Sequence, residues 1–223
     1  IADGVFSLTR SLVFEENSKP KYNLSVAIRA NLRGDYGKDI SVFMGSNYHY
    51  VIYPVNQNNE YNFVLIIKKK LSKEELNNYD LFKNEKFINS LILNLRRNSS
   101  IEFEKLSEMK AFPVFVSNNF LSIKKNIFLS GDALFTFPPS FAQGASQSIE
   151  TSQDILNSIL AGSNDLYKKR IKKIDSINNK SKLNQFSFHL SNPVNIFIRN
   201  IILRHLSKSK NFLENYLGTI YRN

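Results

Sequence analysis

The sequence predicts an α/β (α+β) mixture in which antiparallel strands come first and helices dominate the second half. Three observations lead to this prediction. Apolar and polar residues alternate with period two in several stretches between residues 22 and 70. Apolar residues recur at helical spacing in several segments after residue 72. Of the 223 residues, 42% are hydrophobic and 22% are charged, which is enough apolar material to bury a core.

Three strands are expected in the first part of the chain. They cover residues 23–30, 48–55 and 61–67. The polar segment 56–60 is typical of a turn, so the second and third strands are expected to form an antiparallel hairpin. The aromatic residues of these strands lie either in the core or along an aromatic substrate pocket; they are Tyr48, Tyr50 and Phe63.

Helical signals begin at Ser72, which precedes two glutamates and so marks a helix start. Between 87 and 95, apolar residues form one helix face. Short strands are expected at 112–116 and 127–129. A longer helix is expected over 144–160, with Gly162 as its stop.

The tail carries two further amphipathic stretches. Pro193 suits the first turn of a helix that continues through apolar residues to Ile202, and residues 212–221 show a similar pattern. Such helices most often cover a domain core.

Composition excludes several classes of function. Without cysteine the chain has no disulfide, no thiolate metal site and no cysteine nucleophile. The three histidines are His49, His189 and His205, and their scatter argues against a metal centre. Apolar runs such as 63–67 are far shorter than the roughly 20 residues of a membrane span. No signal segment is visible, so a cytoplasmic protein is expected.

Positive charge is concentrated in the tail. The net charge is +11, and residues 163–223 hold 12 Lys and Arg against 3 Asp and Glu. Lysine dominates over arginine, and no aromatic residues interleave in the lysine-rich run 168–173, which argues against nucleic acid as a partner. Two interpretations stay open: a solvated helix surface, or peripheral contact with an anionic membrane, such as an inner membrane face. A dense basic cluster lies beside the amphipathic stretches; it comprises Lys168, Lys169, Arg170, Lys172 and Lys173.

The strongest motif lies between Gly131 and Ser146. An apolar segment leads into Gly131-Asp132, a Pro-Pro pair follows, and Gly144 opens a helix. An Asp at the end of a strand can accept hydrogen bonds from ribose hydroxyls. The bare N–H groups of a helix start suit an electron-rich carbonyl or a phosphate. The alternative is an ordinary connection in which Asp132 only forms a turn.

A second motif opens the chain at Ala2. Its pattern is Ala-Asp-Gly, two residues, Ser, two residues and Arg, which places Asp3, Gly4 and Arg10 at fixed positions. The chain begins at Ile1, directly inside this motif, so an N-terminally truncated fragment that is inactive alone is expected.

In this order, with a β-rich segment between them, the two motifs resemble those of the FAD-dependent aromatic-ring hydroxylases. These are the flavoprotein monooxygenases related to para-hydroxybenzoate hydroxylase. The resemblance spans most of residues 1–162, and the salicylate-hydroxylase-like and ubiquinone-pathway branches are the most similar.

The resemblance implies a role for each motif residue. Asp132, following Gly131, would hold the ribitol or ribose of FAD, and Pro139 would line the flavin ring. Backbone N–H groups of Gly144, Ala145 and Ser146 would face the pyrimidine end of the flavin. Asp3 and Gly4 would serve the pyrophosphate region and nicotinamide use, and Arg10 would fix the local geometry.

The resemblance also implies an architecture: the C-terminal part of an FAD-binding Rossmann-like domain, an inserted antiparallel β-sheet substrate domain, and C-terminal helices. The expected parts are an Asp-Gly segment at 1–20, the substrate domain at 21–118, the Gly-Asp return at 119–162 and a basic helical tail at 163–223. The implied reaction inserts one oxygen atom of O2 into a small aromatic or quinone-precursor substrate, with FAD as cofactor and NAD(P)H as co-substrate. No side chain is expected to act as a catalytic group, since the cofactor carries the chemistry.

The chain also departs from the family pattern. Leu134-Phe135 stand where family members commonly have Ala-His. No Gly-x-Gly-x-x-Gly turn, which would cradle the ADP half, occurs in the 223 residues. Two alternatives therefore stay open: a flavin-dependent reductase or dehydrogenase on the same fold, and a non-catalytic basic domain that binds membrane surfaces.

Overall fold

The computed structural model describes residues 1–14, 19–56, 58–96, 101–117, 124 and 126–221. These residues form two compact units. The sheet unit contains 22–114 and 188–191, and the helical unit contains 1–21, 115–187 and 192–223. The domain boundary expected at 118/119 falls outside the described residues.

The sheet unit is built on a five-stranded sheet with the order β2-β3-β4-β1-β5. Its strands are β1 (Lys21–Arg33), β2 (Ser41–Gly45), β3 (Tyr48–Pro54), β4 (Glu60–Lys68) and β5 (Leu106–Val116). The predicted hairpin is confirmed, because β3 pairs antiparallel with β4. Sequence reasoning missed β2, a short strand that pairs only with β3 and leaves Val42 and Phe43 exposed.

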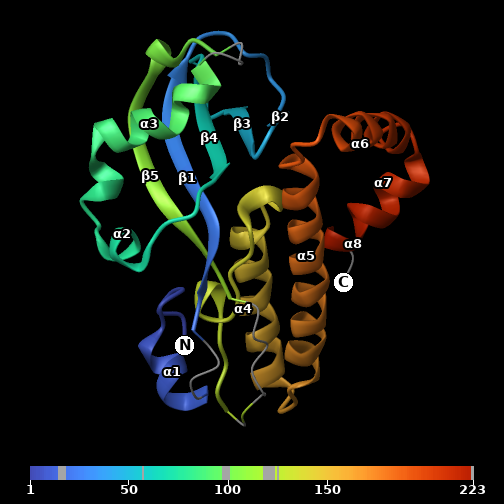
Figure 1. Cartoon of the computed structure of the whole chain (residues 1–223). Coiled ribbons are helices and arrows are strands. Elements are labelled where there is room, and N and C mark those ends of the chain that lie inside the picture. Colours follow the sequence, from blue (N-terminus) through green and yellow to red (C-terminus); the bar gives the residue numbers. More distant parts are fainter. Residues whose placement is uncertain (15–18, 57, 97–100, 118–123, 125, 222–223) are drawn as a thin grey trace. The chain divides into compact units, whose positions relative to one another are not determined.

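One face of the sheet carries the core of this unit. Every second residue of β1 from Val26 to Leu32 is buried, as period-two alternation requires. The predicted helix at 87–95 is α3 (Glu85–Arg96), which covers this face (Figure 1). Tyr50 and Phe63 belong to the core, so the core interpretation is confirmed for these two; Tyr48 is half-buried and packs against the core.

Short elements complete the sheet unit. The helix start predicted at Ser72 is confirmed: Ser72 caps α2 (Lys73–Asn77), and Glu75 returns the capping hydrogen bond. Two 3₁₀ turns are η2 (Leu81–Lys83) and η3 (Phe103–Lys105).

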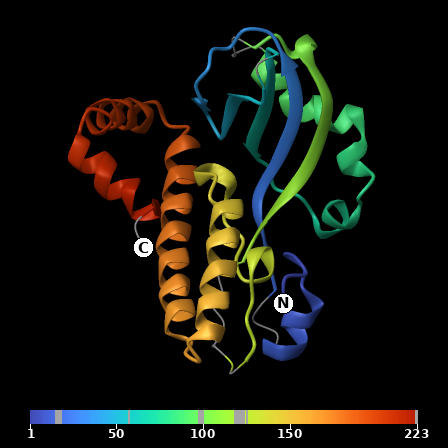
Figure 2. The ribbon, with the colours of Figure 1, turned by 180° about the vertical axis from the view of Figure 1, so that it is seen from behind.

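The helical unit begins with α1 (Leu8–Phe14) and two 3₁₀ turns, η4 (Gly131–Ala133) and η5 (Pro139–Phe141). Then follow α4 (Gly144–Leu160), α5 (Asp165–Phe188), α6 (Pro193–Leu206), α7 (Lys210–Tyr216) and α8 (Gly218–Tyr221). In both views α4 and α5 lie side by side (Figures 1 and 2). The predicted stop is confirmed, since Gly162 has φ +64° and the Ser163 N–H bonds back to the Ser158 carbonyl.

The strand predicted at 127–129 is wrong. Ile127 forms only an isolated bridge with Lys124. The hydroxyl of Tyr167 accepts a hydrogen bond from the Leu129 N–H and donates one to the Leu129 carbonyl, both at 3.0 Å. A side chain from α5 thus meets the backbone groups that a neighbouring strand would otherwise pair.

Candidate functional site

The structure brings the Gly131-Asp132 pair to the first turns of α4. Gly131 adopts φ +61° and opens η4, which the Leu134 N–H closes by bonding to the Gly131 carbonyl at 2.9 Å. A Cβ atom added at Gly131 would stand 3.6 Å from the hydroxyl of Ser148 on α4. The left-handed backbone favours glycine here, while a Cβ would only make ordinary van der Waals contact with the helix.

The start of α4 is open to a ligand. Ala142 turns the chain with φ +52°, and Gln143, the residue before the helix, makes no side-chain cap. No acidic residue lies in the first turn. A Cβ atom added at Gly144 would meet nothing within 4 Å, and Ala145 and Ser146 are exposed. Uncapped N–H groups at the positive end of a 17-residue helix suit an electron-rich oxygen.

Asp132 presents its carboxylate at the surface beside this helix start. The surrounding protein still removes part of its hydration, and this desolvation raises the pKa of the carboxyl above its ordinary value. Leu134 and Phe135, which follow it, are buried in the core of the helical unit. Phe135, which stands where the family pattern described above has histidine, is buried and offers no proton-carrying group.

Asp3 of the first motif is engaged within its own loop. Its Oδ2 accepts a hydrogen bond from the N–H of Thr9 in the first turn of α1, at 3.3 Å. The hydrogen bond from Ser7, together with those from Thr9, lowers the pKa of Asp3 to about 2. Gly4 has φ +87°, the left-handed conformation that glycine adopts most easily.

Arg10 joins the two motifs. Its guanidinium is buried and donates to the Ala133 carbonyl at 2.8 Å and to the Val5 carbonyl at 2.9 Å. The Ser130 N–H also bonds to the Ile1 carbonyl at 2.9 Å. Segments more than 120 residues apart in the sequence thus meet at the Gly-Asp turn. Pro139 lies exposed on η5, between this turn and α4.

Sequence reasoning missed the residues that support this site from α5. Arg170 of α5 bonds to Gln147 and Asp154 of α4, and Tyr167 holds the backbone before the Gly-Asp turn. Their signal was hidden, because buried polar residues interrupt the hydrophobic pattern by which helix faces are recognised.

The tail differs from the predicted basic cluster. Lys168, Lys169 and Lys172 are exposed, but Arg170 and Lys173 turn toward Glu150 on α4. None of the helices in the described part of the chain is both long and apolar enough to cross a membrane.

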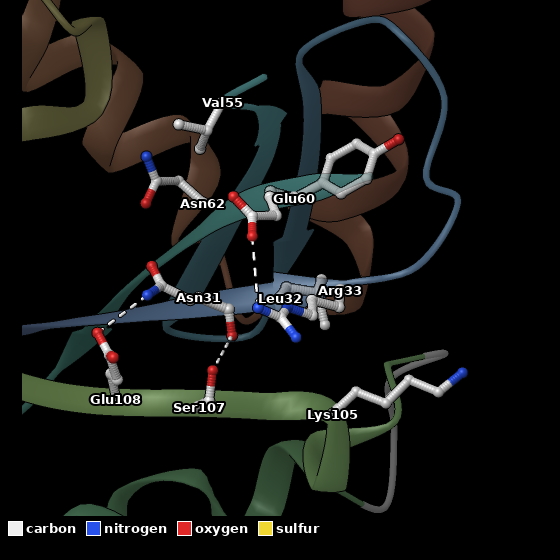
Figure 3. A pocket seen from close by; sticks show the side chains of 10 residues that line it. Asn31, Leu32, Arg33, Val55, Glu60, Asn62, Lys105, Ser107 and Glu108 are labelled. Atoms are coloured by element: carbon white, nitrogen blue, oxygen red, sulfur yellow. Dashed lines mark hydrogen bonds and ion pairs between the residues drawn. The ribbon is translucent and has the colours of Figure 1, made fainter. Parts of the chain in front are cut away.

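The sheet unit has a hollow of about 470 Å³ where the ends of β1, β4 and β5 meet (Figure 3). Two basic and two acidic side chains line it, so their formal charges cancel. Arg33 pairs with Glu60 at 3.4 Å, and the amide of Asn31 donates to Glu108 at 3.0 Å. None of the predicted site residues lines it. Among the described residues, no group of three or more His, Asp or Glu side chains could hold a metal ion.

No protein-family model matches the sequence, and no curated protein sequence matches it significantly. Solved structures do match the fold. HpxO of Klebsiella pneumoniae, solved with FAD and uric acid, is 15% identical with a TM-score of 0.71, over 99% of this chain and 58% of HpxO. A salicylate hydroxylase–substrate complex is 13% identical with a TM-score of 0.69, over 98% of this chain and 62% of the hydroxylase.

The p-nitrophenol 4-monooxygenase PnpA of Pseudomonas putida DLL-E4 is 12% identical with a TM-score of 0.71, over 98% of this chain and 58% of PnpA. The chain thus spans about three-fifths of the length of these proteins, and it has the fold found in part of each.

Proposed function

We propose that this chain forms the flavin-ring part of the cofactor site in an FAD-dependent monooxygenase. The enzyme would insert one atom of O2 into an aromatic or other electron-rich small molecule and reduce the other to water with electrons from NAD(P)H. FAD, when bound, supplies the redox and oxygen chemistry. The residues described here bind and orient it.

The observation that carries this proposal is the meeting of three features in one unit: the Gly-Asp turn, the open start of α4, and the first motif tied in by Arg10. The fold shared with HpxO, which was solved with FAD, supports the same cofactor. The aromatic ligands named for the neighbours, uric acid among them, support an aromatic substrate.

The donor set fits the flavin end of FAD. Asp132 would accept hydrogen bonds from hydroxyls of the ribityl or ribose group, and Pro139 would lie beside the ring. The N–H groups of Gly144, Ala145 and Ser146 would donate to the carbonyl oxygen at the pyrimidine end, where reduced flavin carries negative charge. Asp3 and Gly4 would lie toward the pyrophosphate, although the Asp3 carboxylate already serves α1.

Flavin retention and oxygen uptake test this function. The complete gene product should purify with bound flavin and consume O2 when NAD(P)H and a hydroxylatable phenol are supplied, with hydroxylated product in step. Flavin-dependent NAD(P)H oxidation without hydroxylation would favour the reductase alternative. A protein that binds no flavin would favour the non-catalytic one.

The contact of the tail with an anionic membrane is also a proposal. Its support is the outer face of α6, where Val194, Phe197 and Ile201 are each more than half exposed. We expect the complete protein to sediment with anionic vesicles at low salt and much less at high salt or with neutral vesicles. Equal, negligible sedimentation under all conditions would contradict the contact.

A further inference from the structure

Helix α4 has an inverted distribution of polarity. Three of its polar side chains are buried: Gln147 and Thr151 completely, and Ser158 almost completely. Of its five large apolar residues, only Ile155 packs against the core of the helical unit, and Ile149 and Leu160 are about three-quarters exposed. The apolar burial of α4 therefore rests mainly on Ile155, and polar contacts add to holding this helix on α5.

Arg170 is the centre of those polar contacts. Its side chain is 5% exposed, and its Nε donates to Asp154 Oδ2 at 2.6 Å. Its Nη1 donates to the carboxylate of Glu150, which also accepts from Lys173 at 3.1 Å. Burial alone would raise the pKa of Glu150, but the hydrogen bonds from Arg170 and Lys173 outweigh it and lower that pKa. The carboxylate is therefore charged when it pairs with Arg170.

The same network reaches the helix start. Arg170 Nη1 donates to Gln147 Oε1 at 3.1 Å, and Gln147 Nε2 donates to Gln143 Oε1 at 3.3 Å. Gln143 immediately precedes Gly144. A continuous path of buried polar side chains thus runs from the middle of α4 to the residue that begins it.

A second contact from α5 holds the preceding turn. The hydroxyl of Ser140 in η5 donates to the Ser181 carbonyl of α5 at 2.6 Å. Helix α5 therefore fixes the segment 139–147 at two points, one on each side of the proposed flavin-binding N–H groups.

We propose that Arg170 is a positioning residue for the flavin site, which through Gln147 and Gln143 fixes the first turn of α4 where the cofactor binds. This inference rests on the proposed function. It explains why a charged side chain lies buried on α5, where an apolar residue would pack without desolvation cost.

Three variants separate positioning from general stabilisation. Arg170→Met removes the contacts of Arg170 with Gln147, Glu150 and Asp154 and leaves the bond between Gln147 and Gln143. Gln147→Met breaks the path from Arg170 to Gln143 and the bond from Gln147 to Glu150. It leaves both carboxylate contacts of Arg170, so it serves if the first variant folds poorly. Lys169→Met is the matched control, because Lys169 is exposed on the same helix.

Amide hydrogen exchange in the 223-residue chain is the first measurement. We expect exchange at residues 147–150 to quicken about tenfold or more in both network variants relative to residues 155–160, and not in the control. A uniform rise along α4, or no rise, would overturn the positioning role.

FAD affinity of the complete gene product is the second measurement. Both network variants should weaken FAD binding by about tenfold, and Lys169→Met should leave it unchanged. Wild-type protein that binds no FAD would refute the proposed function. Wild-type binding with unchanged affinity in both network variants would refute the positioning role alone.

Discussion

At the scale of single residues, the two sequence motifs become one site through Arg10. The resemblance implied that this arginine fixes local geometry, but its partner could not be predicted. The acceptor is the carbonyl of Ala133, which lies 123 positions away. Every residue carries a backbone carbonyl, so the identity of residue 133 does not indicate this contact. The low exposure of Arg10, 1%, shows that the contact is internal.

Replacing Arg10 should destabilise the fold. Arg10→Met leaves the Ala133 and Val5 carbonyls without their donor, at about 1–3 kcal/mol for a buried acceptor and less for the half-buried Val5. Urea unfolding measures the loss. Arg33→Met, which removes only an exposed pair with Glu60, should change the free energy of unfolding by less than about 1 kcal/mol. Equal effects of the two substitutions would contradict the role of Arg10.

Asp132 should matter for the cofactor and not for the fold. Its carboxylate is exposed, and each charge-assisted hydrogen bond to a flavin hydroxyl contributes about 1.5–3 kcal/mol. Asp132→Ala in the complete gene product should therefore weaken FAD binding about tenfold or more, with an unchanged unfolding midpoint. Asp175→Ala, an exposed change on α5, is the control. Unchanged affinity in Asp132→Ala would mean that this residue only forms the turn.

At the scale of elements, prediction succeeded where one face of an element is apolar. Strands β1, β3 and β4 and helix α3 follow their hydrophobic periods. It missed α5, although it predicted α4 at its observed bounds, 144–160. Helix α5 buries Arg170, Asn178 and Ser181, so the sequence shows no single apolar face from which a helix could be predicted. The segment 127–129 is as apolar as a buried strand, but no neighbouring strand among the described residues pairs with it. The Tyr167 hydroxyl forms hydrogen bonds with the backbone of Leu129 instead.

A pair of histidines in the sheet unit forms another contact that the sequence pattern did not predict. His49 Nδ1 of β3 lies 2.8 Å from His189 Nε2, which follows α5. Burial, and then the neighbouring His189, lowers the pKa of His49 to about 3. Burial, and then the charge of Lys68, lowers the pKa of His189 to about 4. Both rings are therefore neutral in the folded protein near pH 7.

This pair predicts a loss of stability in mild acid. Below pH 6.5 the unfolded chain takes up protons on both histidines, while the folded pair stays neutral down to about pH 4. The free energy of unfolding should therefore fall between pH 6.5 and 4, at up to about 1.4 kcal/mol per pH unit for each histidine. His189→Gln should reduce this slope, and His205→Gln on the surface of α6 should not. A slope equal in wild type and His189→Gln would contradict the assignment.

At the scale of the whole molecule, the resemblance in two short motifs and the fold agree. The motifs fill fewer than 30 of 223 positions, yet the chain superposes on flavin-bound HpxO over 99% of its length. Sequence identity of 12–15% explains why comparison of sequences alone found no relative, since packing preserves a fold long after side chains have changed. No substrate could be predicted, because two of the three sheet aromatics considered for a pocket, Tyr50 and Phe63, belong to the core.

The central claim is that the Gly-Asp turn and the start of α4 hold the flavin ring. A crystal structure of the complete gene product with FAD tests it most directly. We predict that the pyrimidine edge of the flavin faces the N–H groups of Gly144, Ala145 and Ser146, and that Asp132 accepts a hydrogen bond from a cofactor hydroxyl. Flavin bound elsewhere, or a start of α4 that contacts no cofactor atom, would contradict the claim.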